Sequence, residues 1–407
     1  MKSQNPCHDE HGAVLITSLV FICIFAVLST SAYLTSSSEL KIGSNYTAAR
    51  QAFYDADAGV NYAKARIEYD LANATLTLTG GYEGEIILVS YAAPDGFSFD
   101  TITTLTKQTG TNNYSFQSAG HSGNAQSTIE VFLVRDSLFD SGIFGDIAVD
   151  MKSSAYVYSY DSRTPNPTLG DSTGEASVAS NGTVIVHDDT HIDGGVGLGD
   201  DGAGTEAVLT QTGTPDIQGY LTDVDRVSPD PLGAIGGDLA ADFVTYSTSN
   251  DNASAVPSIS GTTIDTNSTI TLKGKSGGSN FYLTSIILKN GAVLEVDASA
   301  GPVNIYLHGS LEAKNGSMIN LTGIPPDFTV YCDTTDSMIF KHSSVYKGTV
   351  YAPYAHIEMK NSSDVYGMLW GRTIDIKNSG EFYMDMALLD KWLGNTVSIV
   401  SWREIRG

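Results

Sequence analysis

Residues 12–34 read Gly-Ala-Val-Leu-Ile-Thr-Ser-Leu-Val-Phe-Ile-Cys-Ile-Phe-Ala-Val-Leu-Ser-Thr-Ser-Ala-Tyr-Leu, and this stretch decides the fold. Residues 13–38 carry no charged side chain. The 22 residues that begin at Ala13 and end at Leu34 are enough to cross the hydrocarbon core of a bilayer as a helix. The stretch therefore predicts a membrane span.

A helical pattern continues beyond this segment. Apolar residues recur at steps of three and four, which places them on one face of a single helix, and no proline occurs between Pro6 and Pro94. We predict one continuous helix over residues 13–72, about 90 Å long at 1.5 Å per residue. Its stripe is expected to pack against a small β module from Ile42 onward. The stripe comprises Ile42, Tyr46, Ala49, Phe53, Ala56, Val60, Ala63, Ile67 and Leu71.

Two motifs resemble the N-terminus of type IV pilin-like proteins. Residues 9–12 read Asp-Glu-His-Gly, and prepilin peptidase cuts after such a glycine, so the resemblance implies a leader over residues 1–12 and cleavage between Gly12 and Ala13. Residues 50–60 read Arg-Gln-Ala-Phe-Tyr-Asp-Ala-Asp-Ala-Gly-Val and resemble the A-F-x-x-A-E-A-G signature of PilX-type minor pilins. The matching positions are Phe53, Asp57 (in place of the usual glutamate), Ala58 and Gly59.

One position departs from the pilin pattern. Most major pilins have a glutamate at the fifth mature position, where this chain has Thr17. A carboxylate in lipid is costly unless it is paired, and its absence resembles PilX-type and tip subunits. The resemblance therefore implies a minor subunit. A secretory signal cleaved near residues 29–32 and a plain membrane anchor are alternatives, but neither accounts for a stripe that continues past the membrane.

The composition excludes some functions. The 407 residues carry a net charge of -24, which argues against a broad surface for nucleic acid or anionic lipid. The length allows two or three domains. With Cys7 in the leader and Cys23 in the membrane span, Cys332 is alone in the soluble part, so no intramolecular disulfide is expected there. The 41 glycines and many Val, Ile and Tyr residues predict a mainly β soluble part.

A short unit recurs in the second half of the chain. Lys-Asn-Gly, Lys-Asn-Ser or Lys-His-Ser separates short apolar strands, with spacings of 25, 27, 19 and 17 residues. Periods near 20 suggest a β-solenoid whose Asn and Ser corners tolerate left-handed backbone. A β-sandwich with similar turns is the alternative. These repeats also resemble the β-helical modules found behind PilX-type N-termini. The units begin at Lys289, Lys314, Lys341, Lys360 and Lys377.

The predicted fold class is therefore α+β, with a long N-terminal transmembrane and amphipathic helix. A small β module follows over residues 73–136. Residues 137–386 are expected to form a mainly β, right-handed β-solenoid with side loops at 163–181 and 211–262. Residues 387–407 are expected to cap its open end.

Residues 187–206 form the densest polar cluster, in which carboxylates sit among closely spaced glycines. Such carboxylates suit Ca²⁺, and the candidate ligands are Asp193, Asp200 and Asp201. The pattern is neither an EF-hand loop nor a clean nonapeptide repeat, so we favour a solvated turn region. No other cofactor is expected. The adjacent acid pairs do not build a catalytic site, because successive strand residues point to opposite faces. We therefore expect a protein that is not an enzyme.

Together these patterns predict a minor pilin or pilus-tip-like assembly subunit that displays an adhesion or interaction domain. The alternatives are a pseudopilin of a type II secretion system and a membrane-tethered polysaccharide lyase or hydrolase. The resemblance implies three kinds of partner: other pilins, prepilin peptidase and the inner-membrane assembly platform. It also implies a precursor in the bacterial inner membrane, and later a place in the periplasm or in an extracellular pilus.

Overall fold

The computed structural model divides into two compact units, described separately below. Unit 1 comprises residues 1–76, 81–134 and 397–407, and unit 2 comprises residues 77–80 and 135–396. Unit 2 is therefore inserted in the sequence between two parts of unit 1. The structure describes residues 10–73, 75–76, 78, 84–108, 113–137, 141–164, 176–200, 205–219, 221–223, 227–228, 232, 238–391 and 393–405.

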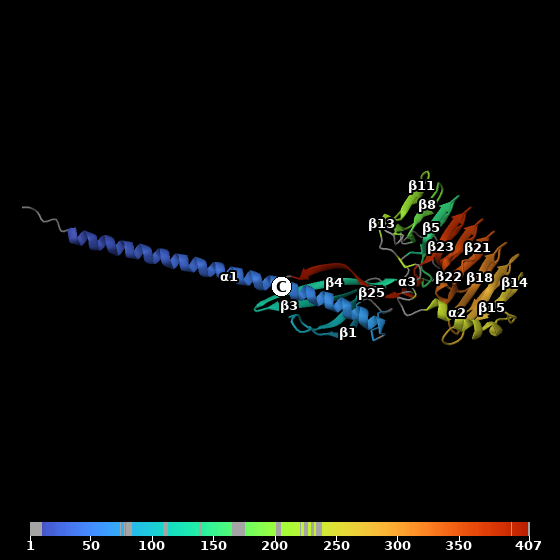
Figure 1. The fold of residues 1–407 in the computed structure, drawn as a ribbon, viewed down its shortest axis with the longest axis horizontal. Coiled ribbons are helices and arrows are strands. Elements are labelled where there is room, and N and C mark those ends of the chain that lie inside the picture. The colour runs from blue at the N-terminus through green and yellow to red at the C-terminus, as the bar shows by residue number, and fades with distance from the viewer. Residues whose placement is uncertain are drawn as a thin grey trace, which may run out of the picture. The chain divides into compact units, whose positions relative to one another are not determined.

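Unit 1 begins with one unbroken helix, α1 (Glu10–Ala72), of 63 residues (Figure 1). The predicted long apolar helix is confirmed. Its N-terminal part is long and apolar enough to cross a membrane, with a mean hydropathy of 2.4 in its most apolar window. Residues 1–9 of the predicted leader lie outside the described residues, and of residues 10–13, which include the predicted cleavage site, the structure describes only the backbone.

The predicted packing stripe of α1 is wrong in its first part. Ile42 is 68% exposed and Tyr46 is 64% exposed, and full burial begins only at Ala52. The length of the sheet explains this difference. The strand that packs on α1 has ten residues and is about 34 Å long, whereas the stretch of helix from residue 42 to 71 is about 44 Å long. The buried apolar side chains among the described helix residues are Ala52, Ala56, Val60, Ala63, Ile67 and Leu71.

A five-stranded sheet covers this last part of α1. Its order is β1-β2-β3-β4-β25, and the pairs among β1 to β4 are antiparallel. Apolar side chains from β3 and β4, such as Tyr114, Phe116, Ile129 and Val131, are buried. The strands are β1 (Ile86–Tyr91), β2 (Ile102–Lys107), β3 (Asn113–Ser122), β4 (Ala125–Ser137) and β25 (Leu393–Ile405).

The C-terminal segment does not cap unit 2 as predicted for residues 387–407. Residues 397–405 of β25 instead lie beside β4 in the sheet of unit 1. Arg403 Nε donates a hydrogen bond to Glu130 Oε2 at 2.6 Å, and Ser127 Oγ donates one to Glu404 Oε1 at 3.1 Å. The pairing satisfies the edge of β4, which otherwise presents unpaired backbone groups. Residues 387–396 of this segment, with α3 (Ala387–Lys391) and the start of β25, belong to unit 2.

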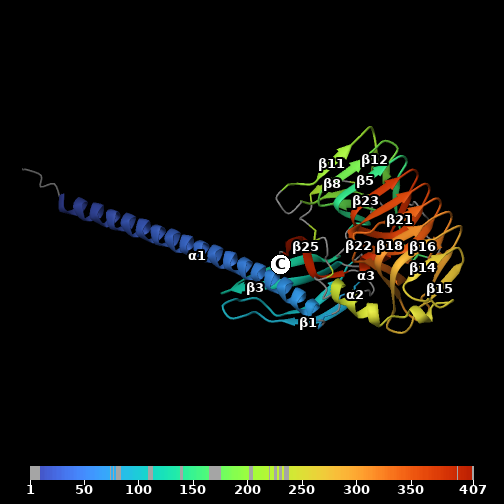
Figure 2. The same ribbon diagram turned by 45° about the vertical axis from the view of Figure 1, so that its right-hand side comes forward.

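Unit 2 is a mostly β body in which strands pair in parallel, many of them with strands about 17 to 27 residues later and β5 and β6 with strands 35 residues later. Figures 1 and 2 show these strands side by side in one stack. Its first strands are β5 (Ile143–Lys152), β6 (Tyr156–Tyr160), β7 (Val178–Ser180), β8 (Thr183–Val186), β9 (His191–Ile192), β10 (Val196–Leu198), β11 (Val208–Gln211), β12 (Asp216–Ile217) and β13 (Leu221–Asp223). The later strands are β14 (Thr263–Thr266), β15 (Thr269–Lys273), β16 (Ser279–Leu288), β17 (Val293–Asp297), β18 (Val303–Ala313), β19 (Met318–Ile319), β20 (Phe328–Cys332), β21 (Met338–Lys341), β22 (Val345–Lys360), β23 (Asp364–Lys377) and β24 (Glu381–Asp385).

The chain enters this stack in the middle. Strands β5 and β6 pair with β23 and β24 on one side and with β7, β8 and β9 on the other. The chain continues to β13 and then to β14, which pairs in parallel with β16. It then returns through β16 to β24. The first and last coils of unit 2 are therefore neighbours.

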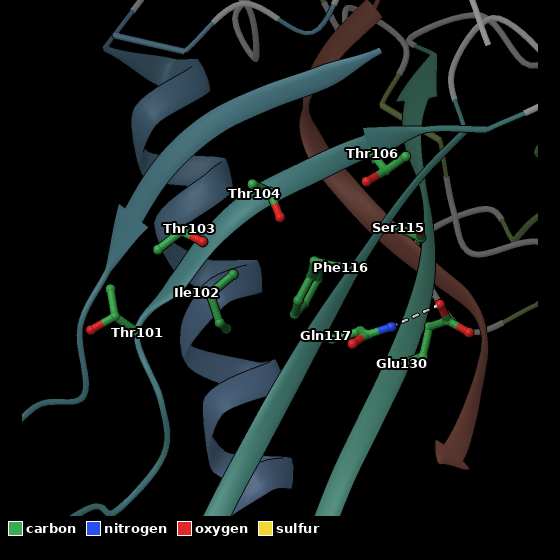
Figure 3. A pocket seen from close by; sticks show the side chains of 9 residues that line it. All are labelled: Thr101, Ile102, Thr103, Thr104, Thr106, Ser115, Phe116, Gln117 and Glu130. Carbon is green, nitrogen blue, oxygen red and sulfur yellow. Dashed lines mark hydrogen bonds between the residues drawn. The ribbon is translucent and has the colours of Figure 1, made fainter. Parts of the chain in front are cut away.

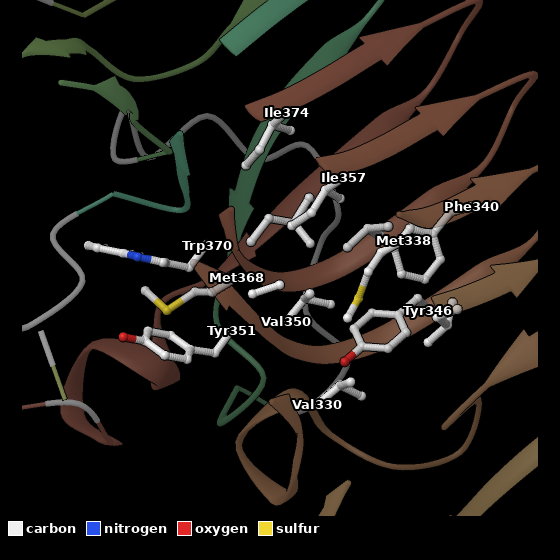
Figure 4. Close-up of a cluster of buried hydrophobic side chains, with 14 of the residues drawn as sticks. Val330, Met338, Phe340, Tyr346, Val350, Tyr351, Ile357, Met368, Trp370 and Ile374 are labelled. Carbon is white, nitrogen blue, oxygen red and sulfur yellow. The ribbon is translucent and has the colours of Figure 1, made fainter. Parts of the chain in front are cut away.

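The core of the stack consists of side chains that alternate along each strand. Figure 4 shows Tyr346, Val350, Met338 and Phe340 gathered together, whereas Tyr351 projects away from them. Tyr351 belongs to a second set of buried or partly buried rings, which lie in register on successive strands. Two rings of this set, on Phe144 and Trp370, stack with centroids 4.0 Å apart. The set is Tyr282, Tyr306, Tyr331, Tyr351, Trp370 and Phe144.

The repeated Lys-Asn units form a corner of the stack. Asn361 and Asn378 have φ angles of 57° and 54°, in the left-handed region that asparagine tolerates. Asn378 Nδ2 donates a hydrogen bond to Asn361 Oδ1 at 3.1 Å, and Asn315 Nδ2 donates one to Asn290 Oδ1 at 3.2 Å. The asparagines thus bond to each other from coil to coil while they turn the backbone.

The segment 211–262, predicted as a loop, holds a helix. The helix is α2 (Leu239–Thr248). Asp238 caps this helix by accepting a hydrogen bond from Ala241 N at 2.9 Å. Phe243 packs on Tyr306, with ring centroids 5.4 Å apart, so α2 covers part of the ring set. Of the other predicted loop, residues 165–175 lie outside the described residues.

Candidate functional site

The PilX-like signature lies where α1 meets its sheet. A Cβ atom at Gly59 would lie 2.2 Å from Ser118 Oγ and 2.9 Å from the ring of Phe99, so only glycine fits there without movement. Ser118 Oγ donates a hydrogen bond to Ala56 O at 2.8 Å, which joins β3 to the helix. Of the other signature residues, Phe53 is half-buried, Ala58 is partly buried and Asp57 is exposed.

The helix N-terminal to this contact has no cover within unit 1. From Val14 to Gln51 nearly every residue is exposed, and the apolar members of the predicted span are among them. Thr17, at the position where most major pilins have a glutamate, introduces no charge into this surface. A helix that is apolar all round is stable only in lipid or against other apolar helices. The exposed half of α1 is therefore a surface for lipid or for partner helices.

The predicted Ca²⁺ ligands do not form a site in the described part of the chain. Asp193 is fully buried, and its Oδ2 accepts a hydrogen bond from Ser159 Oγ at 3.2 Å. Asp200 instead lies in a β-bridge with Glu206, and Asp201 falls outside the described residues. Among described residues no group of three or more His, Cys, Asp or Glu side chains is placed to hold a metal ion.

A polar opening lies on the outer face of the sheet in unit 1 (Figure 3). Strands β2 and β3 pair only at Thr106 and Lys107, and beyond these residues they separate. The opening of about 380 Å³ is lined by threonines of β2 together with Gln117 and Glu130. Gln117 Nε2 donates a hydrogen bond to Glu130 Oε1 at 3.3 Å. Ser115 Oγ, which also lines the opening, accepts a hydrogen bond from Gln108 Nε2 at 2.7 Å.

A second opening, in unit 2, combines apolar walls with one charged group. We call it the Lys347 pocket, and its volume is about 470 Å³. Its walls come from three separate parts of the chain: the end of β6, the loop before β20, and neighbouring strands β22 and β23. It is lined by Tyr160, Ser162, Leu321, Thr322, Gly323, Ile324, Pro325, Val345, Lys347 and Tyr366.

Among the described residues that line the pocket, Lys347 alone carries a charge. Its Nζ lies 5.6 Å from the ring centroid of Tyr366, within cation–π distance. Burial lowers the pKa of Lys347, and the negative charge of Glu295 opposes this effect. In the described residues no carboxylate oxygen lies within 4.0 Å of Lys347 Nζ, whereas Lys341 lies 2.6 Å from Glu312.

Tyrosine rings extend from the pocket along the stack. Tyr366 stacks on Tyr383 with centroids 4.6 Å apart, and Tyr383 stacks on Tyr158 at 5.6 Å. Burial raises the pKa of Tyr366 to about 12, with help from the negative charges of Asp364 and Glu381. These phenols therefore stay neutral at physiological pH, and they can donate hydrogen bonds but not act as bases.

The sequence analysis did not identify this pocket. Val-Tyr-Lys-Gly at residues 345–348 resembles Val-Tyr-Gly at residues 365–367, but this likeness indicates related strands and not a pocket. One sequence signal was available. The lysines of the repeated units, called the corner lysines below, precede Asn or His, whereas Lys347 precedes Gly348. The pocket itself depends on the loop at residues 321–325 meeting Tyr160, and no local pattern encodes that contact.

Comparison with known proteins supports a pilin-like N-terminus. Residues 11–61 match the family model described as PilX N-terminal, so the chain carries a PilX-type N-terminus. Residues 283–391 match a family model described as a domain of unknown function (DUF7305). No curated protein matches the chain.

One solved structure with a detectable likeness is the crystal structure of the competence-associated pilin ComZ from Thermus thermophilus. The match covers 88% of this chain and 98% of that chain, at 12% identity and a TM-score of 0.36. At that identity and TM-score, the likeness establishes neither fold nor function for this protein.

Proposed function

We propose that this protein is a minor pilin or pilus-tip-like assembly subunit. The observation that carries the proposal is the PilX-type N-terminus on a 63-residue helix whose first half is apolar and uncovered in unit 1. In the inner-membrane precursor this half would lie in lipid, and in the fibre it would pack against helices of other pilins. Prepilin peptidase and the inner-membrane assembly platform would act on it between these two states. Such a role is structural and involves no catalysis.

Unit 2 is proposed to be a β-solenoid that displays a binding surface outside the fibre. Parallel pairing at offsets that are mostly about 17 to 27 residues and the asparagine corner support this assignment. In a solenoid each coil contacts only its neighbours, which gives a stiff scaffold with solvated faces. A stiff scaffold suits adhesion because it holds a ligand in place at little cost in conformational entropy.

The processing step is tested by mass spectrometry of the protein from membranes and from sheared fibres. The mature chain should begin at Ala13, and Gly12→Leu should leave the uncleaved precursor in the membrane. As a control, Gly43→Leu changes an exposed helical glycine with open space around it and should be cleaved normally. A mature N-terminus near residue 33 would contradict the proposal.

Assembly is tested by cross-linking from the exposed half of α1. A photoreactive residue at Leu19 or Phe25, both exposed, should form adducts with other pilins in the fibre fraction. The same residue at Ala56 or Ala63, both fully buried under the sheet, should cross-link only within the chain. Equal amounts of adduct with other pilins from the exposed and from the buried positions would contradict the proposed packing of α1 against helices of other pilins.

A further inference from the structure

We propose that the Lys347 pocket binds a single sugar acid, such as the terminal uronic or sialic acid of a glycan. The inference names a ligand class for the display domain and so rests on the proposed function. Its starting point is the contrast between Lys347 and the corner lysines. Lys314 and Lys341 both contact Glu312, at 2.7 and 2.6 Å, and Lys377 contacts Glu358 at 2.6 Å.

Lys347 has a different environment from these corner lysines. Its side chain is half-buried against Tyr366, and in the described residues it has no carboxylate within ion-pair distance. A partly desolvated ammonium gains more from an anionic partner than an exposed one does, because the surroundings screen less. An anion that enters the pocket would supply the partner that the chain does not.

The walls of the pocket restrict what carries this anionic group. Leu321, Ile324, Pro325 and Val345 present apolar surface, which suits the C–H face of a sugar ring. The hydroxyls of Tyr160 and Ser162 stand among them and can bond to ring hydroxyls, and Thr322 Oγ1, which donates to Glu295 Oε1, can still accept a hydrogen bond. A volume of about 470 Å³ is within the usual range for small-molecule sites, about 300–1,000 Å³.

The charge of the protein favours one acidic residue over a polyanion. The chain carries a net charge of -24, and Glu295, Asp297 and Asp327 line a second opening on the other side of the loop 321–325. A polymer with a charge on every unit would be repelled along this surface. A glycan with one terminal acid would bring a single carboxylate to Lys347 and leave neutral units near the carboxylates.

The experiment measures binding of two matched probes to the full-length protein in detergent micelles. Methyl glucuronide and methyl glucoside differ only in the carboxylate, and saturation-transfer NMR or calorimetry reports each affinity. A hydrogen bond to a charged group corresponds to roughly a 10- to 100-fold preference for the glucuronide. Equal affinities, or no binding of either probe, would overturn the proposal without the use of any variant.

Two variants locate the effect. Lys347→Gln should remove the preference for glucuronide, whereas Lys314→Gln, which changes a paired corner lysine, should keep it. Loss of the preference in both variants would mean that general charge is responsible, and its retention in Lys347→Gln would place binding elsewhere. Cyclohexanecarboxylate is a third probe, and binding as tight as that of the glucuronide would show that the site takes any ring acid and not a sugar.

Assembly is scored separately from ligand binding. Lys347→Gln lies far in sequence from α1 and should leave leader cleavage and the amount of protein in sheared fibres unchanged. If the protein binds glucuronide but never enters fibres, the pilin proposal fails, whereas the proposal that the Lys347 pocket binds a sugar acid is retained. If it enters fibres but shows no preference for glucuronide, only the ligand proposal fails.

Discussion

The closest approach between α1 and its sheet predicts a large effect from one added methyl group. A Cβ atom at Gly120 would lie 2.2 Å from Ala52 O and 2.3 Å from Ala56 N, whereas ordinary contacts are about 3.5 Å or longer. Both neighbours are backbone atoms and cannot rotate away. Helix and strand would have to separate by about 1 Å, and overpacking of this kind costs about 1–3 kcal/mol. We expect Gly120→Ala to approach 3 kcal/mol.

Hydrogen exchange measures this cost locally, which matters because a two-unit chain has no single free energy of unfolding. A loss of 3 kcal/mol raises the exchange rate of amides that open with the helix by roughly 100-fold. The affected amides should be those of residues 52–71, where α1 is buried. The separation should also break the hydrogen bond from Ser118 to Ala56.

Two glycines on α1 itself provide matched controls. Gly59→Ala meets the side chains of Ser118 and Phe99, which can rotate, and it gains about 1 kcal/mol of helix propensity. Its effect should therefore be smaller than that of Gly120→Ala. Gly43→Ala has no neighbour within 4 Å and should leave exchange in residues 52–71 unchanged. If Gly120→Ala behaves like Gly43→Ala, the helix does not lie against β3 in solution.

Three further outcomes follow from the structure. Val60→Asp buries an unpaired carboxylate and should speed exchange in residues 52–71 by an amount that corresponds to several kcal/mol, whereas Tyr46→Asp, on the uncovered helix, should change it little. Asn361→Ala puts alanine, which has a Cβ but no polar side chain, at φ 57° and removes the hydrogen bond from Asn378. Denaturant titration should show that this variant destabilises unit 2 by about 1–2 kcal/mol. Asn361→Gly should cost less, because glycine adopts this φ freely. Burial and the charge of Glu381 raise the pKa of Asp364 from 3.8 to about 6. The folded state therefore holds this proton more tightly than the unfolded state, and stability should fall as pH rises from about 4 to about 6; Asp364→Asn should flatten that slope.

The elements that could be predicted from the sequence are those set by local preference. The apolar run and the absence of proline determine α1. The left-handed turns at Asn361 and Asn378 were predicted because asparagine tolerates that backbone wherever it occurs. The helix α2 was also available locally, since Leu239, Phe243 and Tyr246 have helical spacing, but the surrounding Ser, Thr and Asp residues concealed it.

What could not be predicted depends on contacts between distant segments. The predicted position of residues 393–405 was wrong because their local sequence suits pairing with the free edge of any strand. The free edge of β4 exists only once unit 1 has folded. The burial of α1 was overestimated because periodicity marks a face but not the length of sheet that covers it. The Lys347 pocket joins Tyr160 to residues 321–366, and no pattern within either segment encodes that meeting.

The path of the chain explains how a large module is carried by a small sheet. In unit 2, Tyr160 of β6 pairs with Asp385 of β24, so the strands near its entry and exit belong to neighbouring coils. In unit 1, β4 and β25 are neighbouring strands, so the chain also leaves and re-enters that sheet at adjacent places. A module with closely spaced ends can be inserted between two such strands without strain in either fold. In the proposed β-solenoid, coils added or removed between β7 and β22 would leave both pairs of ends in place, because each coil of a solenoid contacts only its neighbours. The length of the proposed display surface could therefore vary while α1 and its sheet, the parts proposed to assemble, stay the same.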